Sequence, residues 1–173
     1  LIDPSTWKFK RVECYKRSLL PPREVNLFLS FIRKNNFELI LEKASELGVK
    51  RVIPLITERS SWSTTEVSKR WEKILHSSLE VSEWGYLPEI GTPIKVKDLP
   101  QNCFILEKDG EVLDVKNIKD PINIVVGPEG GFSDKEKKIF EEKDCKIISL
   151  GKITLKTETA IFVILSLLNF PLK

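Results

Sequence analysis

Short apolar runs alternate along this chain with segments in which hydrophobic residues recur every three or four positions. An apolar run at 25–31 is followed by hydrophobic residues at helical spacing between Phe37 and Leu47, and then, after Gly48, by a β-branched run at 52–56. These periodicities predict a strand, an amphipathic helix that ends at Gly48, and a second strand. Together the three segments predict one β-α-β unit.

The same alternation of strands and helices continues to the end of the chain. A helical apolar face predicts a long helix over 66–84, which Pro88 ends. A capping box of Ser133 with Glu136 predicts a helix start, and an almost wholly apolar helix begins at about Thr157. This alternation is typical of an α/β fold with a mostly parallel sheet and helices on both faces. Three further apolar runs predict strands at 103–106, 121–126 and 147–148.

The first 22 residues differ from the rest in charge. Residues 1–23 carry a net charge of +4, whereas the remaining residues carry −1. A loose alternation over 7–17 predicts one or two strands, and the two consecutive prolines after residue 20 predict a linker. We therefore expect a small attachment at 1–22 and the main domain at 23–173. The basic charge fits phosphate contacts with a polyanion, and a solvated edge hairpin explains it equally well.

Composition limits the functions that fit the chain. With 173 residues, of which 41% are hydrophobic and 31% charged, the chain can form the core of one globular domain. No apolar run reaches the roughly 18 residues of a membrane span, and no secretory signal opens the sequence. We therefore expect a cytoplasmic protein with no membrane contact. Because the sequence begins with Leu1, we also expect it to be part of a longer chain.

Histidine and cysteine usage argues against metal and imidazole chemistry. His76 is the only histidine, so a multi-histidine metal site is excluded and a catalytic triad has one candidate, on a predicted helix. Cys14, Cys103 and Cys145 lack the paired spacings of zinc sites and disulfide frameworks. We expect no bound metal and a reducing compartment.

A glycine-rich loop, Gly127-Pro128-Glu129-Gly130-Gly131, follows the predicted strand that ends at Val126. In parallel α/β sheets, ligands bind at the carboxyl ends of strands, where glycines let the backbone approach a ligand closely. The loop lacks the glycine spacing of dinucleotide-binding and phosphate-binding loops, so neither nicotinamide nor a nucleoside triphosphate is favoured. The residues alone predict a ligand loop, with a tight strand-to-helix turn as the alternative.

A second polar segment, 149–160, also lies between a predicted strand and a predicted helix. The helix is apolar nearly all round over 161–168, and such a helix needs burial on more than one side. A subunit interface would supply that burial, because an exposed apolar strip promotes association. The alternative is a simple helix cap made by Thr157 or Thr159.

Four segments occur in one order along the chain: 41–49, 54–60 with Glu58-Arg59-Ser60, 126–133 and 149–160. In this order they resemble the Q-K-A-T-E-L-G-V, P-x-x-x-E-R-S, G-P-E-G-G-F-S and L-G-x-x-I-L-R-x-E-T-A segments of one family. That family is the ribosomal small-subunit RNA uridine-N3 methyltransferases of the SPOUT superfamily. Since the matches extend from about residue 25 to the end, the chain is identified as a member.

The resemblance implies an architecture that the hydrophobic pattern does not predict. It implies a C-terminal trefoil knot in the sheet, a dimer that forms the active site across its interface, and an N-terminal PUA-like RNA-binding β-barrel. Knots are nearly absent from other folds. Only the end of such a barrel fits into 1–22, so we expect a barrel remnant there.

The resemblance also implies an enzyme that transfers a methyl group from S-adenosyl-L-methionine to N3 of a uridine in 16S ribosomal RNA. The base must be unpaired or flipped out, because N3 takes part in base pairing. The expected partners are 16S ribosomal RNA or the small ribosomal subunit, and a second copy of the chain. The implied cofactor-binding residues come from three segments: Leu106, then Gly127, Pro128, Glu129, Gly130 and Gly131, and finally Leu150, Gly151, Ile153, Leu155 and Thr159.

Charged residues in the matched segments are candidates for catalysis and RNA contact. Arg59 or Lys156 could stabilise the uracil anion and bind phosphate, and Glu129 or Glu158 could organise the loop. We take Arg59, Lys156 and Glu158 as catalytic candidates. The RNA-binding candidates are Lys10, Arg11, Lys34 and Arg59.

Two departures from the family pattern leave a second function open. Lys156 replaces an arginine of the family, which keeps the charge but loses the planar fork for bidentate recognition. Val81-Ser82-Glu83-Trp84 replaces Q-S-G-R, which removes an arginine and adds an acid. The changes motivate a non-catalytic RNA-binding or ribosome-assembly protein that keeps the knotted dimer. A hydrolase built on Thr157, Lys156 and Glu158 has no independent support.

Overall fold

The computed structural model describes residues 19–170, except for the side chain of Lys116. The strands expected in 7–17, the barrel remnant, and the RNA-binding candidates Lys10 and Arg11 lie outside the described residues. The division of the chain at residue 22 stays a prediction.

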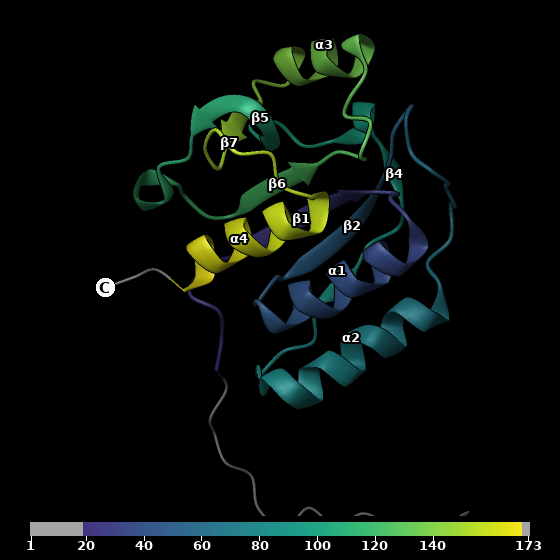
Figure 1. Cartoon of the computed structure of the whole chain (residues 1–173). Helices are drawn as coiled ribbons and strands as arrows, with labels where there is room; N and C mark the ends of the chain where they lie inside the picture. Colours follow the sequence, from purple (N-terminus) through teal and green to yellow (C-terminus); the bar gives the residue numbers. More distant parts are fainter. Residues whose placement is uncertain (1–18, 171–173) are drawn as a thin grey trace, which may run out of the picture.

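Seven strands form one sheet, and each pair of neighbouring strands within residues 19–170 is parallel. The strands are β1 (Val25–Ser30), β2 (Arg51–Ile56), β3 (Glu89–Ile90), β4 (Ile94–Lys95), β5 (Phe104–Val112), β6 (Ile122–Val126) and β7 (Lys146–Ser149). Their order is β3-β2-β1-β6-β5-β7, and β4 also pairs with β2 (Figure 1). The central strands β1 and β6 are almost continuously apolar because both of their faces are covered. The predicted mostly parallel sheet is confirmed.

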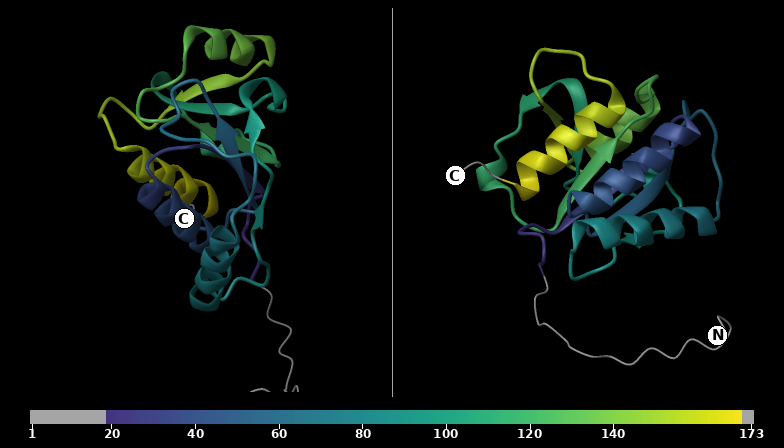
Figure 2. Two further views of the ribbon diagram at one scale, coloured as in Figure 1. Left: turned by 90° about the vertical axis from the view of Figure 1, so that its right-hand side faces the viewer. Right: turned by 60° about the horizontal axis from the view of Figure 1, so that its bottom comes forward.

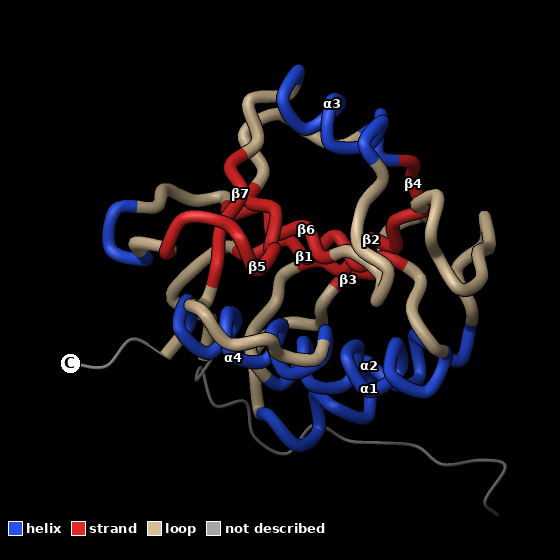
Figure 3. The backbone as a smooth tube through the Cα atoms, turned by 45° about the horizontal axis from the view of Figure 1, so that its top comes forward, coloured by secondary structure: helices blue, strands red, loops and turns tan. Residues whose placement is uncertain are grey.

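Helices cover both faces of the sheet, as predicted. They are α1 (Lys34–Glu46), α2 (Lys69–Ser82), α3 (Asp134–Glu142) and α4 (Thr157–Asn169). Figures 1 and 2 show α1 and α4 side by side on one face, with α2 beyond α1, and Figure 3 shows α3 on the opposite face. The sheet thus separates two hydrophobic clusters, a larger one with residues of α1, α2 and α4 and a smaller one with Phe140 of α3. No helix within 19–170 has both the length and the apolar character needed to cross a membrane.

The predicted helix ends are confirmed at α1 and α3. Gly48 follows the last turn of α1 with a φ of 80°. At α3, Ser133 Oγ accepts from the N–H of Glu136 at 3.3 Å, and Glu136 Oε2 accepts from the N–H of Ser133 at 2.8 Å. Both halves of the predicted capping box are therefore present.

The prediction for α2 was wrong at its end. The helix stops at Ser82, because Glu83 takes a left-handed conformation with a φ of 56°, and Pro88 lies well beyond this point. Val81, which we expected on the apolar face, has 75% of its surface exposed. The chain turns at Glu83 so that Trp84 Nε1 donates to the carbonyl oxygen of Glu46 at 2.9 Å, at the end of α1.

The sheet has parts that the hydrophobic pattern did not predict. Strands β3 and β4 have two residues each, and both pair with β2. Strand β5 continues beyond Leu106 to Val112, with an irregularity in its pairing with β7. Both Leu106 and Glu111 pair with Ile148, so the residues between them form an insertion at the edge of the sheet.

Candidate active site

A cavity of about 390 Å³ lies at the ends of β6 and β7 and beside the middle of β5. Leu106 pairs with Val126 on one side and with Ile148 on the other, so the segments that follow these three positions converge. The cavity is lined by Leu106–Asp109 from β5, by Val126–Glu129, Gly131 and Phe132 after β6, by Lys137 of α3, and by residues of the segment from Ser149 to Ala160. Its size is that of a small-molecule site. The two polar segments singled out in the sequence therefore form one site.

The glycine loop after β6 forms one side of the cavity. The N–H of Gly131 donates to the carbonyl oxygen of Pro128 at 2.9 Å, which closes a tight turn. Gly131 has a φ of 67°, a conformation that side chains with a Cβ rarely adopt. The buried Phe132 then packs edge-on against Phe140 of α3, with ring centroids 4.8 Å apart. The turn joins the sheet to α3 and presents Gly127 and Gly131 to the cavity.

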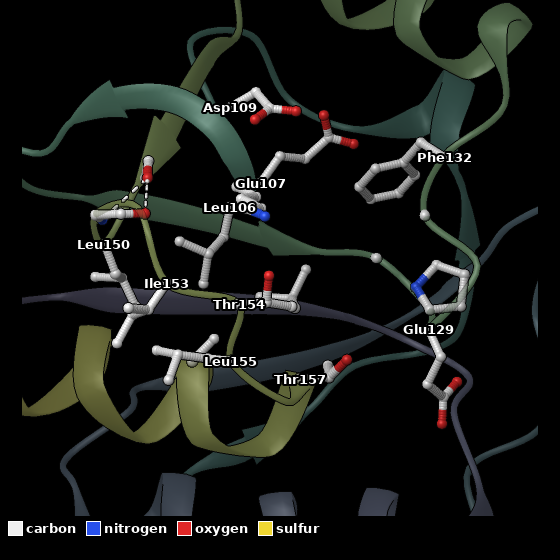
Figure 4. Close-up of a pocket in the computed structure, with 18 of the residues that line it drawn as sticks. Leu106, Glu107, Asp109, Glu129, Phe132, Leu150, Ile153, Thr154, Leu155 and Thr157 are labelled. Atoms are coloured by element: carbon white, nitrogen blue, oxygen red, sulfur yellow. Dashed lines mark hydrogen bonds between the residues drawn. The ribbon is translucent and has the colours of Figure 1, made fainter.

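The segment between β7 and α4 forms the apolar wall. Ser149 Oγ lies 3.0 Å from both the nitrogen and the carbonyl oxygen of Gly151, which fixes the start of this segment. Figure 4 shows the side chains of Leu150, Ile153 and Leu155 gathered beside Leu106 on one side of the cavity. Ile153 lines the cavity and is 70% exposed.

An acidic rim, Glu107 and Asp109, lies on the opposite side of the cavity (Figure 4). Both residues belong to the insertion in β5, and Glu107 Oε2 lies 3.4 Å from Nζ of Lys137 on α3. We missed these residues in the sequence. The sequence does contain a sign of them. Glu107-Lys108-Asp109-Gly110 directly follows an apolar run, and ligand-binding residues of parallel sheets commonly follow such a strand.

Nine of the eleven predicted cofactor-binding residues line the cavity: Leu106, Gly127, Pro128, Glu129, Gly131, Leu150, Gly151, Ile153 and Leu155. Gly130 and Thr159 do not. The carbonyl oxygen of Gly130 accepts a hydrogen bond from Arg59, which does not line the cavity either. Thr159 is exposed, whereas Thr157 and Ala160, three residues apart on one helix face, line the cavity.

The catalytic candidates are not brought together in the cavity wall. Arg59 lies in the loop after β2, and its Nη1 donates to the carbonyl oxygens of Gly130 at 2.7 Å and Phe132 at 3.4 Å. Lys156 is exposed immediately before α4, and Glu158 is half-buried in the first turn of that helix. Neither residue lines the cavity.

The other singled-out residues lie on the helices. Lys34, the first residue of α1, is exposed, with its Nζ 5.2 Å from the centre of the Trp62 ring. His76 is exposed on α2 and is not part of the cavity. Among the described residues, no group of three or more histidine, cysteine, aspartate or glutamate residues could hold a metal ion.

Known proteins resemble the chain in sequence and in fold. The family described as RNA methyltransferase domain matches residues 20–169. Ribosomal RNA small subunit methyltransferase E of Aquifex aeolicus is 34% identical over 87% of this chain and 71% of its own length. The protein of the same name from Mesomycoplasma hyopneumoniae is 30% identical over 94% of this chain and 77% of its own length.

Solved structures extend the likeness to the fold. Ribosomal RNA small subunit methyltransferase E from Neisseria gonorrhoeae, bound to S-adenosyl methionine, has a TM-score of 0.73 at 27% identity. The match covers 85% of this chain and 65% of that one, so about a third of the Neisseria chain lies outside it. The chain therefore belongs to the RNA methyltransferase domain family and, within it, to the ribosomal RNA small subunit methyltransferase E group, as the resemblance predicted.

Proposed function

We propose that this chain is the catalytic part of an S-adenosyl-L-methionine-dependent methyltransferase that modifies N3 of a uridine in 16S ribosomal RNA. The observation that supports it most is the cavity, because the two segments that carry the family pattern form its walls. A relative with the same fold was solved bound to S-adenosyl methionine. A protein that modifies ribosomal RNA works where ribosomes are assembled, so we propose a cytoplasmic location.

The lining suits S-adenosyl-L-methionine. The apolar wall offers a surface for the adenine ring, and the backbone groups of the glycine loop offer hydrogen bonds to its polar edges. Lys108 and Lys137 line the same side as Glu107 and Asp109, and Lys137 lies 3.4 Å from Glu107, so Asp109 is the carboxylate there that we propose faces the cationic groups of the molecule. We propose that Leu106, Gly127, Gly131, Leu150, Ile153 and Leu155 hold the cofactor. When bound, it would supply an electrophilic methyl group.

The residues of the chain would then position the base and stabilise its charge. Lys156 directly precedes α4, where its ammonium and the positive end of the helix dipole both favour an anion such as deprotonated uracil. Glu158 in the first turn could orient Lys156. Lys34 is proposed as an RNA contact, as are Lys10 and Arg11.

The non-catalytic alternative loses part of its motivation. Trp84, which replaces a family arginine, has a packing function at the end of α1, where it hydrogen-bonds to the carbonyl of Glu46 and packs against Phe170 at 6.3 Å between ring centroids. The carbonyl oxygens of Leu47 and Gly48 accept from Asn169 at 2.7 and 3.2 Å. The departure at this position therefore has a structural explanation that does not require lost activity.

We further propose the dimer, the knot and the barrel remnant. On α4, Val163 and Leu167 are 37% and 42% exposed, and Phe170, directly after the helix, is 51% exposed, which supports a second copy of the chain packing there. The chain leaves the edge strand β7 and returns past the cavity to α4 beside α1, and we propose that this return threads the trefoil knot. The residues 1–22 would end the barrel, and 23–173 would form the methyltransferase domain.

The test is methyl transfer to small-subunit RNA from cells that lack this modification. Purified protein, S-adenosyl-L-methionine and the RNA are incubated, and nucleosides are identified by mass spectrometry. We expect 3-methyluridine to appear at one position. Cofactor binding by calorimetry without any methylated nucleoside would favour the non-catalytic alternative instead, and an absence of cofactor binding would contradict the proposed methyltransferase.

A further inference from the structure

Two side chains from outside the glycine loop hold it, Arg59 and Glu136. Arg59 Nη1 donates to the carbonyl oxygens of Gly130 and Phe132 at 2.7 and 3.4 Å. Glu136 is only 4% exposed, and its two carboxylate oxygens accept from two different loops. Oε2 accepts from the N–H of Ser133 at 2.8 Å, and Oε1 accepts from the N–H of Glu58 at 2.9 Å. A capping box explains only the first of these bonds. The second joins the loop after β2 to the first turn of α3, which directly follows the glycine loop.

These contacts fix two peptide planes in the glycine loop. A trans peptide is planar, so its C=O and N–H point in opposite directions and can be held independently. In the peptide between Phe132 and Ser133, Arg59 holds the C=O and Glu136 holds the N–H. In the peptide between Gly130 and Gly131, Arg59 holds the C=O and Pro128 accepts from the N–H at 2.9 Å. Neither plane can rotate without losing two hydrogen bonds, although glycine would otherwise allow rotation.

The loop after β2 that carries Arg59 is held by hydrogen bonds between Thr57 and Ser60. The N–H of Ser60 donates to the carbonyl oxygen of Thr57 at 3.3 Å, and the hydroxyls of Thr57 and Ser60 lie 2.8 Å apart. The N–H of Thr57 also donates to Ser60 Oγ at 3.2 Å. Arg59 is thus presented from a closed turn. Its stem lies against Gly130, where an added Cβ would be 3.5 Å from Arg59 Cδ.

We propose that Arg59 and Glu136 are positioning residues that hold the glycine loop in its cofactor-binding conformation from the neighbouring strand. Arg59 then acts through the loop and not on the uracil or on RNA phosphate, which were the roles expected from the sequence. This proposal rests on the proposed function, because the ligand of the loop is S-adenosyl-L-methionine there. A rival role in RNA contact leads to a different result in the test.

The test compares Arg59→Met with the unaltered protein. Methionine keeps the packing of the stem over Gly130 but removes the donors. We expect the affinity for S-adenosyl-L-methionine, measured by calorimetry, to fall about tenfold, as for the loss of one charge-assisted hydrogen bond. Amide hydrogen exchange should accelerate over 129–133 and stay unchanged in the central strands β1 and β6. The melting temperature should change little, because Arg59 is exposed.

Arg70→Met is the matched control. Arg70 is also exposed and holds Glu38 at 2.6 and 2.7 Å on the helices, so its loss should alter neither cofactor affinity nor exchange in the loop. Glu136→Gln is a second variant, since it replaces one of the two accepting carboxylate oxygens by an NH2 group and leaves one of the two N–H groups without its acceptor. It should weaken cofactor binding and accelerate exchange over 129–133 as Arg59→Met does, and it should also lower the melting temperature because Glu136 is buried. If it does not fold, Arg59→Met decides alone.

An Arg59→Met protein that binds the cofactor like the unaltered protein overturns the proposal, and a loss of RNA affinity in that protein would assign Arg59 to RNA contact. If the unaltered protein binds no S-adenosyl-L-methionine, the proposed function fails. Amide exchange rates measured without cofactor then decide separately whether Arg59 and Glu136 hold the loop. Equal rates over 129–133 in the unaltered protein and in Arg59→Met would overturn the proposal that these residues hold it.

Discussion

Gly110 is the residue that lets the acidic rim lie against the sheet. A Cβ at this position would lie 2.5 Å from the backbone carbon of Ile148 and 2.6 Å from its nitrogen, so the insertion in β5 can pass β7 only without a side chain. We expect Gly110→Ala to lower the free energy of unfolding by about 1–3 kcal/mol, the usual cost of overpacking, and to weaken cofactor binding. Urea unfolding measures the first effect.

Gly130→Ala serves as the control for Gly110→Ala. Its Cβ would meet Arg59 Cδ at 3.5 Å, an ordinary van der Waals contact. The stability of this variant should stay within about 0.5 kcal/mol of the unaltered protein. Equal stabilities of the two alanine variants would show that the backbone at Gly110 can move aside.

The pKa of the Cys145 thiol is lowered to about 7, so this side chain ionises near neutral pH. Cys103 and Cys145 directly precede the paired residues Phe104 and Lys146, so they lie across β5 and β7 from each other. The thiol of Cys103 can donate to the carbonyl oxygen of Pro100, at 3.3 Å, or to Cys145. A hydrogen bond from Cys103 lowers the pKa of Cys145 to about 7, whereas the same bond and burial raise the pKa of Cys103.

The thiolate is the nucleophile, so alkylation of Cys145 should be slow below pH 7 and fast above it. We expect the midpoint of the iodoacetamide rate, followed for the Cys145 peptide by mass spectrometry, near pH 7. In Cys103→Ala the donor is lost, and the midpoint should rise toward the roughly 8.5 of an ordinary thiol. A midpoint that is the same in both proteins would contradict the hydrogen bond.

The helices and strands that the sequence predicted are those long enough to show a hydrophobic periodicity. The segments β1, α1 and β2 were found with their glycine boundary, and α3 was found through its capping box. The two-residue strands β3 and β4 carry no period and were missed. The insertion in β5 was missed because its register depends on β7, about forty residues later.

The segments that form the candidate site were predictable from the sequence, but the contacts between distant residues were not. Both motif segments lie at strand ends, so their convergence followed from a parallel sheet. The contact between Arg59 and Gly130 joins residues 71 apart, and no local pattern contains it. The sequence also does not place Lys156 relative to the cavity wall, because a motif gives the order of residues and not the direction of their side chains.

The helix α4 carries the prediction about association. Leu167 is 42% exposed on a helix whose other face is packed against the sheet, and Leu167→Glu would place a charge in the proposed interface. We expect sedimentation at micromolar concentration to give a dimer for the unaltered protein and a monomer for the variant. Val81→Glu, at an apolar residue of α2 that is 75% exposed, should remain a dimer. A stable monomer of the unaltered protein would contradict the proposed interface.

At the scale of the whole molecule, the parallel sheet places the carboxyl ends of its strands at one edge, and this geometry gathers the cavity from three distant segments. If the cavity holds S-adenosyl-L-methionine, adding this molecule should change amide hydrogen exchange at the cavity and leave distant helices unchanged. We expect slower exchange over 106–109, 127–133 and 149–157, with α2 unchanged. Protection confined to α1 and α2, or no protection at saturating concentration, would contradict it.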